Sequence, residues 1–401
     1  RPRPWGWGSL KRCPHPPGKR RLRRPVGPPR RGGGGRHRGV AAGRAAGGGP
    51  GILHDFLYPG HSRMRMVGPP AGYGQRLQQD LYTAVARQPR IAVRHEAGVL
   101  GLATSAGGRV RGVRLAGGEV LEGACVVLAT NGFGANKAMV REHLGSSVAN
   151  GVYLGSPLNT GEALAWAAQL GAATERMGAF QGHASVVAPS GPLVTWGVVV
   201  NGAILVNTEG RRFGNELVGY SAYSRSVMAQ PGAEAVEVFP EACLAACRGT
   251  RFEEVLEAGA MGTFGSVEEL CSAHGLPPER LAAAVDEVRR AAGGADGFGR
   301  PWPRESPFGG VPGALHAVRV RAALFHTQGG LRCDASQRVL RADGSPIGGL
   351  FAAGGTAAGL SGHDALGYLS GNGLLHAVVS GRWAGRAAAG VWCDGVPAPS
   401  L

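Results

Sequence analysis

The most informative part of the sequence is FHTQGGLRCDASQRVLRADGSPIGGLFAAGGTAAGLSGHDALGYLSGNGLLHAVVSGRWAGRAAA, residues 325–389. Two short apolar runs flank Asp343-Gly344, a dipeptide typical of a hairpin turn, and a helix rich in small residues follows them. We expect the first turn of that helix to be Ser370-Gly371-Asn372-Gly373. Backbone N–H groups in a first turn have no acceptor within the helix, so such an end attracts electron-rich or anionic groups. Glycines there let a flat ring approach the backbone, and the stretch therefore predicts a cradle for one edge of a cofactor.

Further segments with a recognisable pattern precede it, namely VVLATNGFGANKAMV (126–140), NTGEALAWAAQLGAA (159–173), NGAILVNTEGRRFGNE (201–216) and ADGFGRP (295–301). Together with HTQGGL, GYLSGNGLL and SGRWAGRAA, and in the expected order, they resemble the superfamily of FAD-dependent fumarate reductases and 3-ketosteroid Δ1-dehydrogenases. The resemblance covers about residues 54–390. It implies an α/β fold, in which a Rossmann-like FAD/NAD(P)-binding domain is split in the sequence by an inserted α+β capping domain.

The resemblance divides the chain into four parts. We expect a tail at 1–53, the first part of the FAD-binding domain at 54–150, a substrate or capping domain at 151–310, and the second part of the FAD-binding domain at 311–401. Local patterns predict strands near Ile91–Arg94, Gly98–Thr104 and Arg109–Ala116, strand character over Thr195–Asn207, and helices at Val267–Ala273 and Pro278–Ala292.

The net charge of +16 over 401 residues is concentrated at one end of the chain. Residues 1–50 hold fourteen Lys or Arg and no Asp or Glu, whereas residues 51–401 hold 29 basic and 27 acidic residues. We expect the Gly- and Pro-rich segment 1–50 to be disordered, because it cannot bury enough apolar surface to offset its ordering entropy. An RNA-binding tail is one interpretation of it. We favour unrelated sequence joined to a truncated enzyme, because no GxGxxG turn follows an apolar strand anywhere in the chain.

The seven cysteines are scattered and form no CxxC pair. No histidine or further cysteine near Cys243 and Cys247 completes a metal set, so we predict no metal site. Reduced thiols indicate a cytoplasmic location. No apolar run approaches the roughly 18 residues that a membrane span needs.

The cofactor that the resemblance implies is FAD. The residues that it assigns to FAD are Thr130, Asn131, Gly132, Gly354, Gly355, Gly371, Asn372, Gly373, Leu374 and Leu375. Gly132 is equally well explained as a turn glycine. Gly355 stands where many relatives have a glutamate that meets the adenosine ribose, which weakens the expected hold on the ADP half of FAD.

Four side chains are candidates for catalysis. By resemblance, His183 in FQGHASV and His326 in FHTQGG fall where fumarate reductases place substrate-binding histidines. Tyr220 stands in place of the proton-delivering arginine, as in ketosteroid dehydrogenases, and the turn that contains Tyr368 has no arginine. Two carboxylates need charged partners, so we do not expect a dicarboxylate substrate. A buried, hydrogen-bonded structural role is the alternative for each of these side chains. We expect Arg211 and Arg212 to pack or to pair with Glu216 rather than bind substrate.

We therefore predict a FAD-dependent oxidoreductase that transfers a hydride between flavin and a carbon–carbon bond next to a carbonyl group. Its partner would be a neutral or weakly polar small molecule, with no membrane partner, and nucleic acid is not the expected partner. The electron acceptor or donor is left open. Two alternatives remain: an inactive or fragmentary flavoprotein with a spurious basic N-terminus, and an Arg/Gly-rich nucleic-acid-binding tail on a dead enzyme domain.

Overall fold

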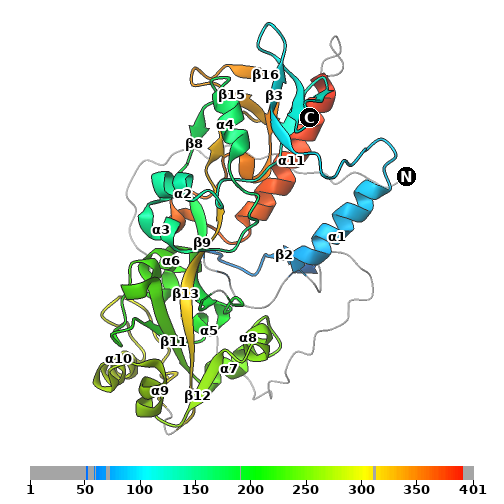
Figure 1. Cartoon of the computed structure of the whole chain (residues 1–401). Coiled ribbons are helices and arrows are strands. Elements are labelled where there is room, and N and C mark those ends of the chain that lie inside the picture. Colours follow the sequence, from blue (N-terminus) through cyan, green and yellow to red (C-terminus); the bar gives the residue numbers. More distant parts are fainter. Residues whose placement is uncertain are drawn as a thin grey trace, which may run out of the picture. The chain divides into compact units, whose positions relative to one another are not determined.

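One long strand, β13 (Leu315–Thr327), organises the largest sheet (Figure 1). The computed structural model describes residues 51–52, 58, 60–68, 73–189, 191–309 and 313–391, so segment 1–50 lies outside the described residues. Strand β13 pairs antiparallel with β9 (Phe180–Val187), β11 (Glu234–Pro240) and β12 (Met261–Phe264) and parallel with β7 (Val152–Tyr153), and β10 (Ile204–Val206) completes the sheet beside β11. Most of its residues are buried, including successive ones that point to opposite faces, so the strand is covered on both faces.

Two apolar cores lie against this sheet. Successive side chains of a strand point to opposite faces, and in β11 Val236 and Val238 join one core while Ala235 and Phe239 join the other. The elements between β9 and β13 are α5 (Gly197–Val200), η1 (Glu216–Val218), α6 (Tyr220–Met228), η2 (Pro231–Ala233), α7 (Glu241–Cys247), α8 (Glu253–Glu257), α9 (Val267–His274) and α10 (Pro278–Arg290).

Helices α9 and α10 confirm the helices predicted at Val267–Ala273 and Pro278–Ala292. The Ser266 hydroxyl accepts a hydrogen bond from the Glu269 N–H at the start of α9, and proline opens α10. The predicted strand character over Thr195–Asn207 is wrong in its first half, because Gly197–Val200 forms the short helix α5. Most apolar side chains of that helix are buried. A short helix therefore explains this apolar run as well as a strand does.

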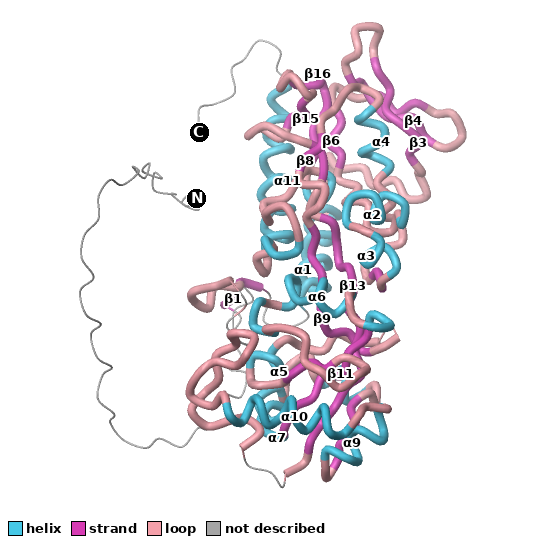
Figure 2. Tube along the Cα trace, turned by 90° about the vertical axis from the view of Figure 1, so that its left-hand side faces the viewer, coloured by secondary structure: helices cyan, strands magenta, loops and turns pink. Residues whose placement is uncertain are grey.

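A second sheet carries the C-terminal stretch. Strands β6 (Val126–Leu128) and β16 (Pro346–Ala352) run parallel, and β15 (Arg338–Leu340) pairs antiparallel with β16. The predicted hairpin is confirmed, with Gly344 in the left-handed region at φ 84°. Helix α11 (Asn372–Val391) begins two residues later than expected from Ser370, and Figures 1 and 2 show it beside these strands. Its Ala384 packs with Phe351 and Ala353 in a small core.

The remaining described elements surround these sheets. They are β1 (Gly51–Ile52), β2 (Val67–Gly68), α1 (Tyr73–Ala86), β3 (Val99–Thr104), β4 (Val110–Leu115), β5 (Val120–Glu122), α2 (Lys137–Leu144), α3 (Ser146–Asn150), α4 (Glu162–Ala168), β8 (Thr174–Glu175), β14 (Gly330–Leu331), η3 (Gly354–Thr356) and η4 (Ala365–Gly367). Strands β3 and β4 confirm the pattern prediction. The strand predicted at Ile91–Arg94 is absent from this described part, because Ile91 and Val93 are exposed in a loop and pair with no strand.

The architecture is α/β, as predicted. The described residues belong to one compact unit, Gly48–Leu401, and the division at residues 150 and 310 stays a prediction. No helix in the described ranges has the length and apolar character needed to cross a membrane. Within the same ranges, no group of three or more His, Cys, Asp or Glu side chains is placed to hold a metal ion.

Candidate active site

A cavity of about 780 Å³ lies at the start of α11. Asn131, which follows β6, and Gly354, which follows β16, line one side of it. This is the carboxyl end of two parallel strands, the place where open α/β sheets bind ligands. The volume is within the range of about 300–1,000 Å³ of small-molecule sites. The described structure therefore has a ligand-sized cavity at the end of the sheet where the sequence predicts the cofactor cradle.

The lining of the cavity is uncharged. Among the described residues that line it there is no Arg, Lys, Asp or Glu. Its polar groups come from side chains such as Asn131, Tyr220, His326, Gln328 and Tyr368. A ligand of this size meets hydrogen-bonding groups and apolar surface here, but no fixed charge from a side chain.

The turns at the ends of β6 and β16 are packed against each other at glycines. Asn131 adopts the left-handed conformation at φ 66°, and its backbone carbonyl accepts a hydrogen bond from the Thr356 hydroxyl at 3.1 Å. A Cβ atom on Gly355 would approach the Asn131 side-chain oxygen to 2.1 Å. Gly371, just before α11, is also left-handed at φ 86°. These turns leave bare backbone along the cavity wall, which suits close approach of a flat ring.

One buried polar atom on the cavity wall has no partner in the described structure. It is Nε2 of His376, which lies on the first turns of α11. A ring nitrogen or carbonyl group of a flavin is chemically able to bond it. The bare turns, the first turn of α11 and this imidazole together fit the flavin end of FAD.

The predicted cofactor residues divide into two groups. Those that line the cavity are Asn131, Gly354, Gly355, Gly371, Gly373 and Leu374. The other four make contacts elsewhere: the Thr130 hydroxyl lies 3.4 Å from that of Thr356, and Asn372 bonds the Ser361 hydroxyl at 3.4 Å. A Cβ atom on Gly132 would meet the Thr327 hydroxyl at 2.0 Å, so close packing already explains this glycine. Leu375 lines a smaller neighbouring cavity.

Two tyrosines meet at the cavity. Tyr220 is the first residue of α6, and its hydroxyl donates a hydrogen bond to the Ser370 hydroxyl at 2.8 Å. The ring of Tyr368 lies 6.2 Å from that of Tyr220. Burial raises the pKa of Tyr220, and hydrogen bonds with Ser370 and Tyr368 oppose this rise. Burial also raises the pKa of Tyr368. Both phenols are therefore neutral hydrogen-bond donors at neutral pH.

The two predicted histidines differ in position. His326 lines the cavity, and its Nδ1 lies 3.2 Å from the Thr327 carbonyl oxygen. A carbonyl oxygen only accepts, so Nδ1 carries the proton in that bond. His183 does not line the cavity, because its ring is stacked between Tyr220 at 4.8 Å and Phe325 at 5.6 Å. Burial lowers the pKa of His183 to about 3 and also lowers the pKa of His326. Both rings are neutral.

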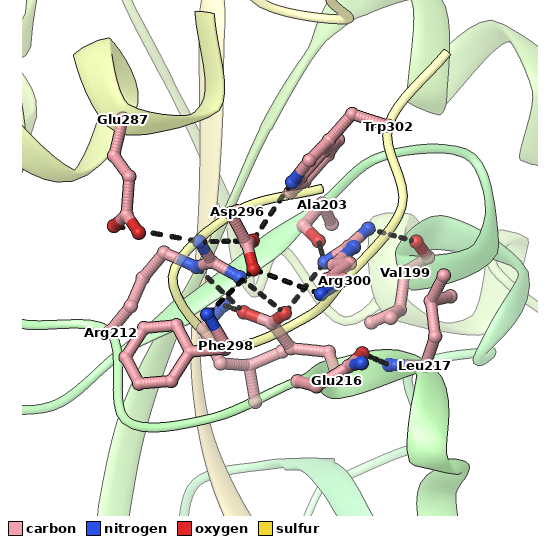
Figure 3. A network of polar contacts seen from close by, with 12 residues as sticks. Val199, Ala203, Arg212, Glu216, Leu217, Glu287, Asp296, Phe298, Arg300 and Trp302 are labelled. Carbon is pink, nitrogen blue, oxygen red and sulfur yellow. Dashed lines mark hydrogen bonds and ion pairs between the residues drawn. The ribbon is translucent and has the colours of Figure 1, made fainter. Parts of the chain in front are cut away.

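A buried ion network fixes the turn that leads into α6 (Figure 3). The Glu216 carboxylate accepts hydrogen bonds from Arg212 at 2.9 Å, from Arg300 at 2.8 Å and from the Leu205 backbone at 3.2 Å. Asp296 bonds the other side of Arg212 at 2.8 Å. The expected pair with Glu216 is thus confirmed for Arg212, whereas Arg211 is exposed and pairs with Glu209 instead. Because the side chains of this network are buried and paired with one another, they hold residues 212–219 and, with them, the start of α6 at Tyr220.

Sequence reasoning missed several residues of the site. Ser370 was noted only as part of a helix start, yet its hydroxyl bonds Tyr220 across 150 positions of sequence. Gln328 lies 3.4 Å from the ring of His326 and also borders the cavity. Asp296 and Arg300 belong to the segment ADGFGRP, which carried a resemblance but no assigned role. A polar residue directly before a glycine-rich helix start was the available signal for Ser370.

Comparisons with known proteins extend this picture. The sequence profile of the family described as FAD binding domain matches residues 15–374. A NADH:fumarate oxidoreductase of Klebsiella pneumoniae (strain 342) is 31% identical over 292 residues, which are 71% of this chain and 30% of that protein. The matched range of the profile begins within the Arg-, Gly- and Pro-rich segment.

Two solved structures share the fold. The open conformation of a flavocytochrome c3 fumarate reductase superposes with a TM-score of 0.68 at 28% identity, over 82% of this chain and 58% of that one. The 3-ketosteroid-Δ4-(5α)-dehydrogenase of Rhodococcus jostii RHA1, in complex with 4-androstene-3,17-dione, gives a TM-score of 0.56 at 29% identity, over 75% of this chain and 60% of that one. The chain therefore spans less than two thirds of each of these three proteins.

Proposed function

Because the chain belongs to the FAD binding domain family, we propose that it is a FAD-dependent oxidoreductase acting on a carbon–carbon bond next to a carbonyl group of a neutral or weakly polar small molecule. Family membership confirms the predicted α/β FAD-binding fold and FAD as the cofactor. The reaction and the substrate class are our proposal.

The observation that carries the proposal is the uncharged lining of the cavity. The dicarboxylate fumarate gives its name to one group of relatives, and two carboxylates need Arg or Lys partners to offset their desolvation. The described lining of this cavity offers none. Its phenols and neutral imidazole can instead donate hydrogen bonds to a carbonyl oxygen. The ketosteroid dehydrogenase relative holds the neutral ketone 4-androstene-3,17-dione, which supports this choice.

Each polar residue has a role in the proposed reaction. FAD bound at the start of α11 would supply or accept the hydride. In the dehydrogenation direction the substrate loses a hydride from one carbon and a proton from its neighbour. To take that proton, Tyr220 would first have to lose its own hydroxyl proton to solvent; in the reverse direction its neutral phenol, held by Ser370, is placed to give a proton to the substrate carbon. Tyr368 is placed to donate a hydrogen bond to the substrate carbonyl. A neutral His326 adds no charge that would favour a carboxylate.

The test uses the full chain with added FAD. Flavin absorbance that stays with the protein after desalting would establish binding. A panel of cyclic ketones that includes 4-androstene-3,17-dione is then compared with succinate under anaerobic conditions, with loss of flavin absorbance as the signal. We expect ketones and not succinate to reduce the flavin, and to do so far more slowly in Tyr220→Phe, which keeps the ring but lacks the hydroxyl. Faster reduction by succinate than by every ketone would refute the proposed substrate class.

The cellular setting is also a proposal. All described cysteines are free, which supports the predicted cytoplasmic location through the reduced state of thiols there. The electron acceptor or donor that completes the cycle is left open.

A further inference from the structure

Glu237 is a fully buried carboxyl group that makes no ion pair with any described residue. Its Oε1 has no hydrogen-bond partner in the described structure, and its Oε2 is bonded to the Ser185 hydroxyl. An ionised carboxylate with a bare oxygen is expensive to bury, whereas a protonated carboxyl leaves only a neutral oxygen unpaired. In agreement, burial raises the pKa of Glu237 to about 7.

The side chain of Glu237 points toward the half of the core that contains the site. It lies on β11 between Val236 and Val238, which belong to the core of α9 and α10, and therefore faces the other side, together with Ala235 and Phe239. Tyr220 belongs to that same core. A carboxyl at this strand position interrupts an otherwise apolar surface, and no role in the ion network of Arg212 and Glu216 accounts for it.

A continuous set of contacts leads from Glu237 to Tyr220. Ser185 bonds Glu237 through its hydroxyl and donates its backbone N–H to His183 Nδ1 at 3.1 Å. Because Nδ1 accepts this bond, the single proton of the neutral imidazole sits on Nε2. The His183 ring then stacks on Tyr220 at an interplanar angle of 19°. Glu237 thus contacts Ser185, Ser185 orients His183, and His183 packs against Tyr220, the proposed proton-handling residue.

We propose that Glu237 is a positioning residue of this site, which acts through Ser185 to hold His183 as its Nε2–H tautomer against Tyr220 and keeps the surroundings of Tyr220 uncharged while it is protonated. The proposal rests on the proposed function only for its effect on rate. When Glu237 loses its proton, a negative charge appears on the same side of the sheet and opposes removal of a proton from Tyr220. The rate of dehydrogenation should then fall as the pH rises through the titration of Glu237.

Other charged and titratable groups near Glu237 come from several elements. They are Glu216 on η1, Arg300 in the loop after α10, Cys243 and Cys247 on α7, His183 on β9 and His316 on β13. Arg300 and Glu216 satisfy each other, and burial raises the pKa of both thiols to about 12. His316 is held by Thr263 and Glu241. None of these supplies a partner for the free oxygen of Glu237.

The first test compares the wild type with Glu237→Gln, which keeps size and hydrogen bonding but cannot ionise. With a ketone that reduces the flavin, we expect the two rates to agree within about twofold near pH 6 and the variant to be about threefold faster or more near pH 8. Ser185→Ala is the matched control, because it removes the hydroxyl but keeps the backbone N–H that bonds His183. Because the charge on Glu237 acts through space, we expect Glu237→Gln to remove the pH dependence also when it is added to Ser185→Ala.

The second test needs neither FAD nor turnover. Nitrogen NMR of ¹⁵N-histidine-labelled full chain, with the His183 signal assigned through His183→Gln, should show one Nε2–H tautomer in the wild type and in Glu237→Gln. Ser185→Ala keeps the backbone N–H but frees it from Glu237, so we expect the same tautomer with a broadened His183 signal. A pH profile for Glu237→Gln identical to that of the wild type, or a His183 signal unchanged in Ser185→Ala, would overturn the proposal. A wild type that binds FAD but oxidises no ketone would defeat the proposed function, while the NMR result would still decide the role of Glu237.

Discussion

The sharpest stability prediction concerns Arg300→Met in the buried network. The Arg300 side chain is almost fully buried, and its guanidinium donates to Glu216 at 2.8 Å, to the Ala203 carbonyl at 2.8 Å and to the Val199 carbonyl at 2.9 Å. Burial lowers the pKa of Arg300, and the carboxylate of Glu216 opposes this. The guanidinium also lies 4.0 Å over the Trp302 ring, a surface that a methionine side chain can still cover.

The expected magnitude follows from what the substitution leaves behind. Two buried carbonyl oxygens lose their donor, at about 1–3 kcal/mol each. Glu216 keeps its ion pair with Arg212, so the Glu216 carboxylate is not left unpaired. The loss of the two carbonyl bonds is thus the main cost, and we expect the free energy of unfolding to fall by about 2–6 kcal/mol.

The assay is urea unfolding of the full chain, followed by tryptophan fluorescence and circular dichroism. Arg94→Ala is the matched control, because the Arg94 pair with Glu119 is equally short at 2.9 Å but exposed. We expect this control to lose much less than Arg300→Met, because water and salt screen an exposed ion pair. A loss for Arg300→Met no greater than the loss for Arg94→Ala would refute the reasoning that the network fixes the turn before Tyr220.

Three further predictions test other contacts. The raised pKa of Glu237 stabilises the folded protein by about 3 kcal/mol at pH values below the ordinary pKa of 4.5, and this contribution is lost as the pH rises to about 7. Urea unfolding at several pH values should show this fall in the free energy of unfolding for the wild type and a flatter profile for Glu237→Gln. Ser370→Ala removes the acceptor of the Tyr220 hydroxyl and should lower ketone turnover about tenfold with little change in flavin binding; an equal loss of flavin would indicate a structural role instead. Gly132→Ala places a methyl group 2.0 Å from the Thr327 hydroxyl and should lower the free energy of unfolding by about 1–3 kcal/mol, and a melting temperature equal to that of the wild type would contradict this.

Local chemistry explains which parts of the fold could be predicted. The Asp343-Gly344 turn, the start of α9 after Ser266 and the proline at the start of α10 are encoded by neighbouring residues. The loop at Ile91 also contains apolar residues, but it pairs with no strand among the described residues. No local sequence pattern reveals whether a partner strand is present. Strand pairing depends on what else the chain brings alongside.

The candidate site shows the same limit more strongly. Sequence patterns identified Tyr220 and His183, but only the fold shows that one ring lines the cavity and the other lies behind it. Ser370 and Arg300 act on partners 150 and 84 positions away. Hydrogen bonds of that separation leave no periodicity or spacing in the sequence, so these two pairings could not be predicted from it.

The position of Glu237 on β11 also has a consequence for how the strands align during folding. A slip of β11 by one residue would turn Glu237 toward Leu281 and the core of α10, whose described members are apolar. The same slip would turn Val236 and Val238 away from that core. The misaligned strand would thus bury less apolar surface and would also leave a buried carboxyl group without a hydrogen-bond partner. Glu237 therefore favours a single register of β11 against β13. Replacing it by leucine would reduce the difference in free energy between the two registers.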